Sequence, residues 1–257
     1  MSRNGVCIRT QHLNKTFGSI RAIHDLNLEV LEGSRFGFLG PNGAGKTTTV
    51  RILSGLLAQT SGTGTVCGLD ITTQREEIKA VTGLLPETPG LYSKLSAVEF
   101  LEFIGALNGY ARDALHRRID HLLAILGLES RQDDLLESYS SGMKQKVLVA
   151  STLLHEPKLV FLDEPASRLD PAASALVKEL ILALAEETAT SFFVCTHQTS
   201  FAEDVCDVIG IIIDGQLVTK GSPQEIIAAA KAANLEKAYL KIVGGKIDRQ
   251  ALLAWRA

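Results

Sequence analysis

The first third of the chain alternates short apolar runs with polar residues. Residues 7–9 and 26–30 have the pattern of half-buried strands, and residues 35–39 form a short run typical of a buried strand. From residue 46 the apolar side chains of Val50, Leu53 and Leu57 recur at the spacing of one helix face. We therefore expect a small antiparallel sheet within residues 6–40, with a strand and a helix at its end.

The rest of the chain changes from helical to strand patterning and back. Residues 96–156 carry two helical apolar faces, formed by Phe100, Phe103, Ile104 and Leu107 and by Ile119, Leu122, Leu123 and Leu126. Buried-strand runs follow at 159–162 and 191–195, and a helix striped with Leu176, Leu180 and Leu184 lies between them. Strand, helix, strand predicts a parallel α/β sheet.

The C-terminal part of the chain contains one hairpin signal and one helix-start signal. Asp214 and Gly215 separate the apolar runs 208–213 and 216–219, which predicts a hairpin. Residues 222–225 read Ser-Pro-Gln-Glu, a capping box with proline at the first helical position, so we expect a C-terminal helix to begin there.

The predicted strand at 35–39 and helix from residue 46 enclose a match to the phosphate loop G-x-x-x-x-G-K-[ST]. Its glycines let backbone N–H groups surround phosphates at a helix N-terminus, while Lys46 reaches the outer phosphates and the Thr47 hydroxyl is a ligand for Mg²⁺. The chain is therefore predicted to bind a nucleoside triphosphate. We assign to this site Gly40, Pro41, Asn42, Gly43, Ala44, Gly45, Lys46, Thr47 and Thr48.

A second chemical element ends the apolar run 159–162. Asp163 and Glu164 follow it directly. Adjacent acids at a strand end are usually a solvated turn, but a phosphate-loop enzyme needs one acid to hold Mg²⁺ and another to orient or deprotonate water. We assign Asp163 to the metal and Glu164 to the water.

Composition limits the partners and the cellular compartment that we expect for the protein. The 26 basic and 29 acidic residues give a net charge of −3, so we expect no nucleic-acid partner. Four cysteines without C-x-x-C spacing predict neither a zinc site nor a disulfide framework and favour a reducing compartment. No apolar stretch approaches the roughly 20 residues of a membrane span, so any membrane role would depend on a partner.

Over nearly its whole length the chain resembles an ABC-transporter ATP-binding subunit. The resemblance implies a phosphate-loop NTPase core with a parallel sheet, a small antiparallel β-subdomain and an inserted helical subdomain. On that basis we place the ATP-binding domain at 1–222, its helical subdomain at about 88–156, and a C-terminal helical tail at 223–257.

Several further roles follow from the resemblance alone. Phe17 occupies the place of an aromatic residue that stacks on adenine. The family's Leu-Ser-Gly-Gly-Gln signature corresponds to residues 139–143, which read Tyr-Ser-Ser-Gly-Met and lie just ahead of a predicted helix. In the family, this helix N-terminus contacts the γ-phosphate of ATP held by the opposite subunit. The nucleotide-contacting residues of this segment are Ser140, Ser141, Gly142 and Met143.

Two more positions complete the comparison. His197 resembles the switch histidine that contacts the γ-phosphate and helps hold Glu164, so the implied catalytic residues are Lys46, Glu164 and His197. Glu87 replaces the usual glutamine beside Mg²⁺, which makes Thr47, Asp163 and Glu87 the implied metal ligands. The added negative charge should raise the pKa of the neighbouring carboxyls unless Mg²⁺ compensates.

The resemblance implies an ATP-hydrolysing, Mg²⁺-dependent subunit that powers transport, with export favoured, through separate transmembrane permease subunits. It would act as a homodimer, peripheral to the cytoplasmic face of the membrane, and contact the permease through residues 87–107. A GTPase would need Asn-Lys-x-Asp, but Asn14 and Lys15 are followed by Thr and Phe. A small-molecule kinase would not need the signature or His197 positions, and a soluble ABC-type ATPase unrelated to transport remains the alternative.

Overall fold

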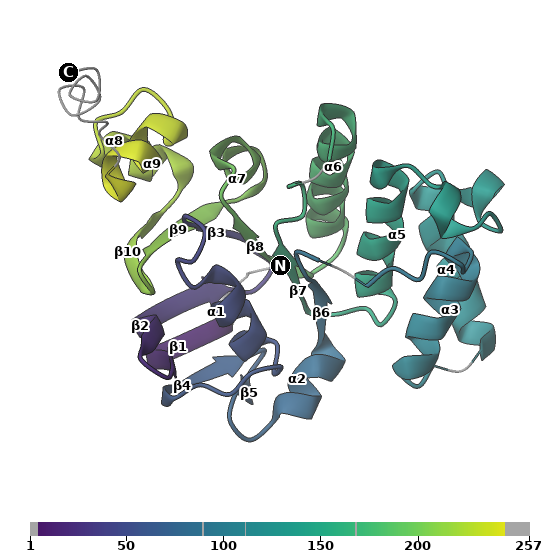
Figure 1. Cartoon of the computed structure of the whole chain (residues 1–257), viewed down its shortest axis with the longest axis horizontal. Coiled ribbons are helices and arrows are strands. Elements are labelled where there is room, and N and C mark those ends of the chain that lie inside the picture. The colour runs from purple at the N-terminus through teal and green to yellow at the C-terminus, as the bar shows by residue number, and fades with distance from the viewer. Residues whose placement is uncertain (1–4, 89, 111, 168, 245–257) are drawn as a thin grey trace, which may run out of the picture.

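The computed structural model describes residues 5–88, 90–110, 112–167 and 169–244, which build two sheets and a set of flanking helices (Figure 1). The smaller sheet is antiparallel, in the order β2-β1-β4-β5. Its strands are β1 (Val6–Phe17), β2 (Ile20–Leu31), β4 (Ser61–Val66) and β5 (Leu69–Asp70). In β2 buried and exposed side chains alternate from Leu26 to Leu31, because one face packs on the core and the other faces solvent.

The larger sheet has the order β10-β9-β3-β8-β7-β6 and is parallel except for the β9–β10 hairpin. Its strands are β3 (Arg35–Leu39), β6 (Thr82–Leu85), β7 (Leu159–Asp163), β8 (Ser191–Thr196), β9 (Val208–Ile213) and β10 (Gln216–Gly221). Stacked and tilted rings of Phe36, Phe38, Phe161 and Phe193 fill its centre, with centroids 5.3 to 6.4 Å apart. The carboxyl ends of β3, β7 and β8 meet at one edge, where ligands bind in parallel sheets.

Nine α-helices lie within the described residues (Figure 1). They are α1 (Lys46–Leu53), α2 (Arg75–Val81), α3 (Ala97–Leu107), α4 (Arg112–Ile125), α5 (Ser141–Leu153), α6 (Pro171–Glu187), α7 (Thr199–Val205), α8 (Pro223–Ala229) and α9 (Leu235–Val243). Two 3₁₀ turns cover Glu129–Arg131 and Leu136–Ser138. Figure 1 shows α3, α4 and α5 on the opposite side of the parallel sheet from the antiparallel sheet.

The main sequence expectations about the fold are confirmed. The parallel sheet, the antiparallel sheet, the hairpin at Asp214 and the capping box at Ser222 are all present. The strand β1 is longer than the expected 7–9, and the segment of β4, β5, α2 and β6 was not anticipated, because its apolar residues are sparse and its glycines frequent. The domain limits 1–222, 88–156 and 223–257 remain predictions, and residues 245–257 of the tail lie outside the described part of the chain.

One close approach joins β6 to α5. A Cβ atom on Gly83 would lie 2.4 Å from the backbone oxygen of Thr152, so only glycine fits there without movement of the helix. The contact matters for the site, because the chain leaves β6 toward Glu87 while α5 begins at Ser141.

We predict that Gly83→Ala lowers the free energy of unfolding by about 2 kcal/mol, because the methyl group forces the sheet and helix apart. Urea denaturation followed by circular dichroism measures the change. Gly90→Ala is the matched control, since its Cβ meets no atom within 4 Å, and it should stay within about 0.5 kcal/mol of the parent. Equal losses in the two variants would contradict the close-packing argument.

Candidate active site

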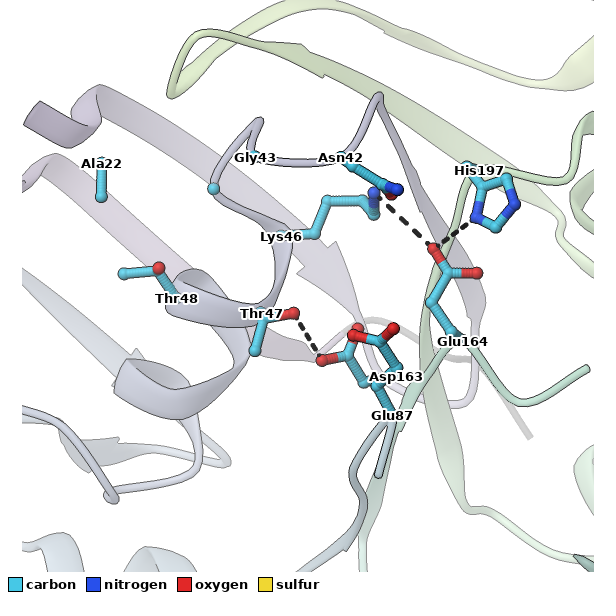
Figure 2. Close-up of a pocket in the computed structure, with 11 residues that line it drawn as sticks. Ala22, Asn42, Gly43, Lys46, Thr47, Thr48, Glu87, Asp163, Glu164 and His197 are labelled. Atoms are coloured by element: carbon cyan, nitrogen blue, oxygen red, sulfur yellow. Dashed lines mark hydrogen bonds and ion pairs between the residues drawn. The ribbon is translucent and has the colours of Figure 1, made fainter. Parts of the chain in front are cut away.

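A cavity of about 340 Å³ lies at the carboxyl edge of the parallel sheet. The β3–α1 loop forms one wall, and the ends of β7 and β8 and the loop after β6 form the other (Figure 2). Its lining residues are Ala22, Asn42, Gly43, Gly45, Lys46, Thr47, Thr48, Glu87, Asp163, Glu164 and His197. Folding therefore brings together segments that are far apart in the sequence.

The Lys46 ammonium is almost completely buried at the cavity wall. Its Nζ donates to the carbonyl oxygens of Gly40, at 2.7 Å, and Pro41, at 3.1 Å. It also lies 3.7 Å from Oε1 of Glu164 (Figure 2). The positive charge is thus held by its own loop, beside a carboxylate, at the place where phosphate groups would enter.

The loop approaches β2 closely at Gly45. This residue has a φ of +101°, and a Cβ atom there would lie 2.4 Å from the backbone oxygen of Ala22. Both facts require glycine, because a side chain would strain the backbone and collide with β2. The contact places the N-terminus of α1 toward the cavity, where its backbone N–H groups favour anions.

Asp163 and Thr47 form the part of the site suited to a divalent cation. The Thr47 hydroxyl donates to Oδ2 of Asp163 at 2.7 Å, and Oδ1 is buried with no hydrogen-bond partner among the described residues (Figure 2). Burial raises the pKa of Asp163, and the charges of Glu164 and Glu87 raise it further, against the Thr47 hydrogen bond. This agrees with the expectation that Glu87 would raise the pKa of a neighbouring carboxyl.

These groups fit Mg²⁺. A hydroxyl and a carboxylate with an unsatisfied oxygen are the hard ligands that Mg²⁺ takes, typically one or two from the protein alongside phosphate oxygens and water. Within the described residues no group of three or more His, Cys, Asp or Glu side chains is arranged to hold a metal by itself. The donor set is therefore that of a metal shared with a phosphate ligand rather than of a permanently held ion.

Glu164 is held by both its backbone and its side chain. Its backbone has a φ of 54°, uncommon for a residue with a side chain, and its N–H donates to the oxygen of Cys195 at 2.8 Å. Thr196 Oγ1 donates to one carboxylate oxygen at 3.2 Å. His197 Nδ1 lies 2.9 Å from the other carboxylate oxygen (Figure 2). Because an ionised carboxylate only accepts, Nδ1 carries the proton of that bond and the second ring nitrogen stays available.

Comparisons with known proteins agree with this geometry. A family model described as "ABC transporter" matches residues 23–167. The chain belongs to the ABC transporter family. The bacitracin transport ATP-binding protein BcrA of Bacillus licheniformis is 39% identical over 213 residues, covering 82% of this chain and 68% of that protein. The Nod factor export ATP-binding protein I of Cupriavidus metallidurans is 33% identical over 232 residues, covering 90% and 76%.

A solved structure of an ATP-binding subunit of an ABC transporter shares the fold. It superposes with a TM-score of 0.81 at 28% identity and covers 92% of this chain and 99% of that one. The chain is accordingly a nucleotide-binding subunit of this family, and the cavity beside the phosphate loop is its candidate nucleotide site. Among the helices of the described residues, none has the length and apolar character to span a bilayer.

Some residues that the sequence assigned to the nucleotide lie outside the cavity. Gly40 and Pro41 contribute through the carbonyl oxygens that hold Lys46, and Ala44 is buried behind the loop. Phe17 is 47% exposed at the end of β1, with Nζ of Lys15 4.7 Å from the centre of its ring. The adenine role of Phe17 stays a prediction.

The signature segment is also separate from the phosphate loop of the same chain. Ser140 caps α5, with its side chain accepting from the N–H of Met143, and both Ser140 and Ser141 are exposed. Gly142 lies close to α6, where an added Cβ would come within 2.8 Å of Ala173. This segment does not line the cavity, and its contact with the nucleotide of a partner subunit stays a prediction.

Two residues of the site were missed in the sequence. Ala22 lines the cavity from β2, and nothing in an alternating strand distinguishes one small residue from another. Thr196 holds Glu164. The sequence did hold a clue to the role of Thr196, which lies directly before the implied switch histidine. Its hydroxyl group therefore falls at the same sheet edge as Glu164.

The raised pKa of Asp163 leads to a prediction about stability. Because the native pKa lies above the ordinary 3.8, ionising Asp163 disfavours the native state as the pH rises from 3.8 through the native pKa. In the absence of Mg²⁺ and nucleotide, Asp163→Asn should therefore gain stability relative to the parent over this range and hold the gain at neutral pH. Guanidinium denaturation at a series of pH values measures the difference, and a difference independent of pH would contradict the argument.

Proposed function

We propose that this subunit hydrolyses ATP, with Mg²⁺, to power export of a substrate through a separate membrane subunit. The observation that carries the proposal is the position of Glu164. Its carboxylate is held by Thr196 and His197, faces the Lys46 ammonium and borders the phosphate-loop cavity. A carboxylate fixed at that place is suited to orient a water molecule toward the γ-phosphate and accept its proton.

The neighbouring residues supply positioning and charge. Lys46 would exchange its contacts with two carbonyl oxygens for contacts with the outer phosphates, where charge accumulates during phosphoryl transfer. His197, with Nδ1 bound to Glu164, keeps Nε2 for the γ-phosphate. Thr47 and Asp163 would hold Mg²⁺, with Glu87 beside them, and the ion supplies neutralisation of the phosphate charge.

We further propose that two copies of the chain act together. The exposed signature residues lie at the N-terminus of α5, a suitable anion site that does not face the cavity of its own chain. A second copy would let each signature reach the phosphates held by the other copy. Each nucleotide would then be buried between two subunits, which excludes water other than the attacking molecule.

The membrane partner would bind near Glu87. Tyr92 and Phe103 contact edge to face, with centroids 5.3 Å apart, and both are exposed, as is Leu107. This exposed aromatic patch, defined as Tyr92, Phe103 and Leu107, follows the Glu87 loop, and exposed aromatic side chains are typical of protein–protein interfaces. The transport and export names of the relatives favour a permease as the partner and export as the direction. The subunit would then be peripheral, on the cytoplasmic face of the membrane.

One variant tests hydrolysis and pairing together. Glu164→Gln keeps the size of the side chain and one of its two acceptor oxygens but removes the base, so ATP hydrolysis should fall roughly 100-fold to 10,000-fold. ATP binding should be retained, and gel filtration with ATP and Mg²⁺ should show a dimer that persists because turnover no longer opens it. Phosphate release and equilibrium nucleotide binding measure the two effects.

Lys46→Ala serves as the contrasting variant. It removes the charge that contacts the phosphates, so nucleotide binding itself should weaken and no ATP-dependent dimer should accumulate. If Glu164→Gln hydrolyses ATP at the parent rate, Glu164 is not the base. If it binds ATP tightly but stays monomeric at all concentrations, the paired arrangement is wrong.

Another variant tests the binding of the membrane partner. Phe103→Ser removes the ring that packs on Tyr92 and should weaken association with membranes of the source cell about tenfold, leaving ATP binding unchanged. Val218→Ser is the control, because Val218 is 47% exposed on β10, away from the patch. Co-sedimentation with those membranes measures the association. Equal binding by the two variants would remove the exposed aromatic patch from the interface.

A further inference from the structure

A second cavity, of about 630 Å³, lies at the opposite edge of the parallel sheet from the nucleotide site. It borders the residues at which β7 and β8 begin, whereas the nucleotide site borders the residues at which they end. Cys7, Cys67, Lys158 and Ser191 contribute to its lining. Two cysteines that the nucleotide chemistry does not use therefore border this cavity, the half-buried Cys67 and, behind it, the buried Cys7.

The two thiols are neighbours in space although 60 positions separate them in the chain. The Sγ atoms of Cys7 and Cys67 lie 3.7 Å apart, and both cysteines are free thiols. Cys7 lies in β1, and Cys67 follows β4, the adjacent antiparallel strand. The N–H of Cys67 donates to the oxygen of Cys7 at 2.7 Å, which fixes the two backbones side by side.

This arrangement needs little motion to form a bond. The two sulfur atoms of a disulfide lie about 2.05 Å apart. Side-chain rotation therefore has to shorten the present Sγ–Sγ distance of 3.7 Å by less than about 2 Å. Cys7 and Cys67 lie one residue past Ile8 and Val66, the last paired residues of the β1–β4 ladder. The backbone hydrogen bond between the residues can remain in place.

The surroundings also favour reaction at this pair. The hydrogen bond from the second thiol lowers the pKa of Cys7, with a further contribution from the Ser191 hydroxyl, and the same bond raises the pKa of Cys67. Cys7 therefore ionises more easily than Cys67, although burial opposes ionisation of both. Lys158 favours a negative sulfur at Cys67, whereas Glu32, which lines the same cavity, disfavours one at either cysteine.

We propose that Cys7 and Cys67 form a site of reversible oxidation by hydroperoxides, closing an intramolecular disulfide. One thiolate attacks the peroxide, breaking the O–O bond to give a sulfenic acid and, for hydrogen peroxide, hydroxide. The other sulfur then attacks that sulfenic sulfur and displaces its hydroxyl group. In total two thiols lose two electrons and two protons, and hydrogen peroxide becomes two water molecules. Thiol reductants reverse the change.

The remaining cysteines are an internal reference. Cys195 and Cys206 are buried, and burial raises the pKa of both thiols, that of Cys206 to about 12. Neither lines the second cavity. Cys7 is as buried as these two, so the pair differs from them in its half-buried member Cys67, which borders the second cavity and has a thiol neighbour.

The test treats the full, folded chain with hydrogen peroxide, blocks free thiols and maps peptides without reduction. We expect a Cys7–Cys67 linkage to form before Cys195 or Cys206 is modified and to disappear with dithiothreitol. The linkage should also raise Tm, because it closes a loop across the 60 positions between these residues. Retained nucleotide binding separates this modification from general damage.

Cys67→Ser and Cys7→Ser should each abolish both the linkage and the peroxide-dependent rise in Tm. Cys206→Ser is the matched control and should keep both. The proposal is overturned if the folded parent yields mainly over-oxidised Cys67, or linkages to Cys195 or Cys206, or if Cys7 and Cys67 remain reduced after the reference cysteines have reacted. Cys67 is only partly buried, so its variant gives an interpretable result even if Cys7→Ser destabilises the fold.

Discussion

The structure depends on three charges buried at one sheet edge. Lys46, Asp163 and Glu164 are the charged residues that the described part of the chain buries almost completely, and all three line the nucleotide cavity. One ammonium faces two carboxylates, so the cluster carries an excess negative charge away from bulk water. Such an arrangement costs folding free energy, which a bound cation would offset. The raised pKa of Asp163 and its unpartnered oxygen are the local signs of that cost.

The sequence revealed the features of the fold and of the site that depend on residues adjacent in the chain. The phosphate loop, the strand ending in Asp163 and Glu164, and the capping box at Ser222 are each defined by a few adjacent residues, and local spacing is sufficient to recognise them. The contact between Thr47 and Asp163 joins positions 116 apart. Its geometry depends on strand order, which periodicity does not specify.

The contacts that the sequence did not predict also depend on which strands lie side by side. Ala22 matters because β2 crosses close to Gly45, and Cys7 and Cys67 meet because β1 pairs with β4, a strand whose serine, threonine and glycine residues conceal it. Spacing rules such as C-x-x-C detect only neighbours in sequence. Contacts made by sheet pairing, even between chemically informative residues, therefore become visible only with the fold.

Glu164 also gives a route by which a membrane subunit could influence the nucleotide. Besides the nucleotide cavity, Glu164 lines a smaller neighbouring hollow of about 250 Å³, which Glu87, Ser141 and Gln145 also line. Gln145 of α5 donates to the oxygen of Pro165, directly after Glu164. Close packing of β6 on α5 at Gly83 means that movement of the Glu87 loop and of the signature helix is not independent. Glu87, the signature helix α5 and the Glu164 carboxylate line the same hollow. A partner that shifts Glu87 and α5 would therefore also change the position of the Glu164 carboxylate.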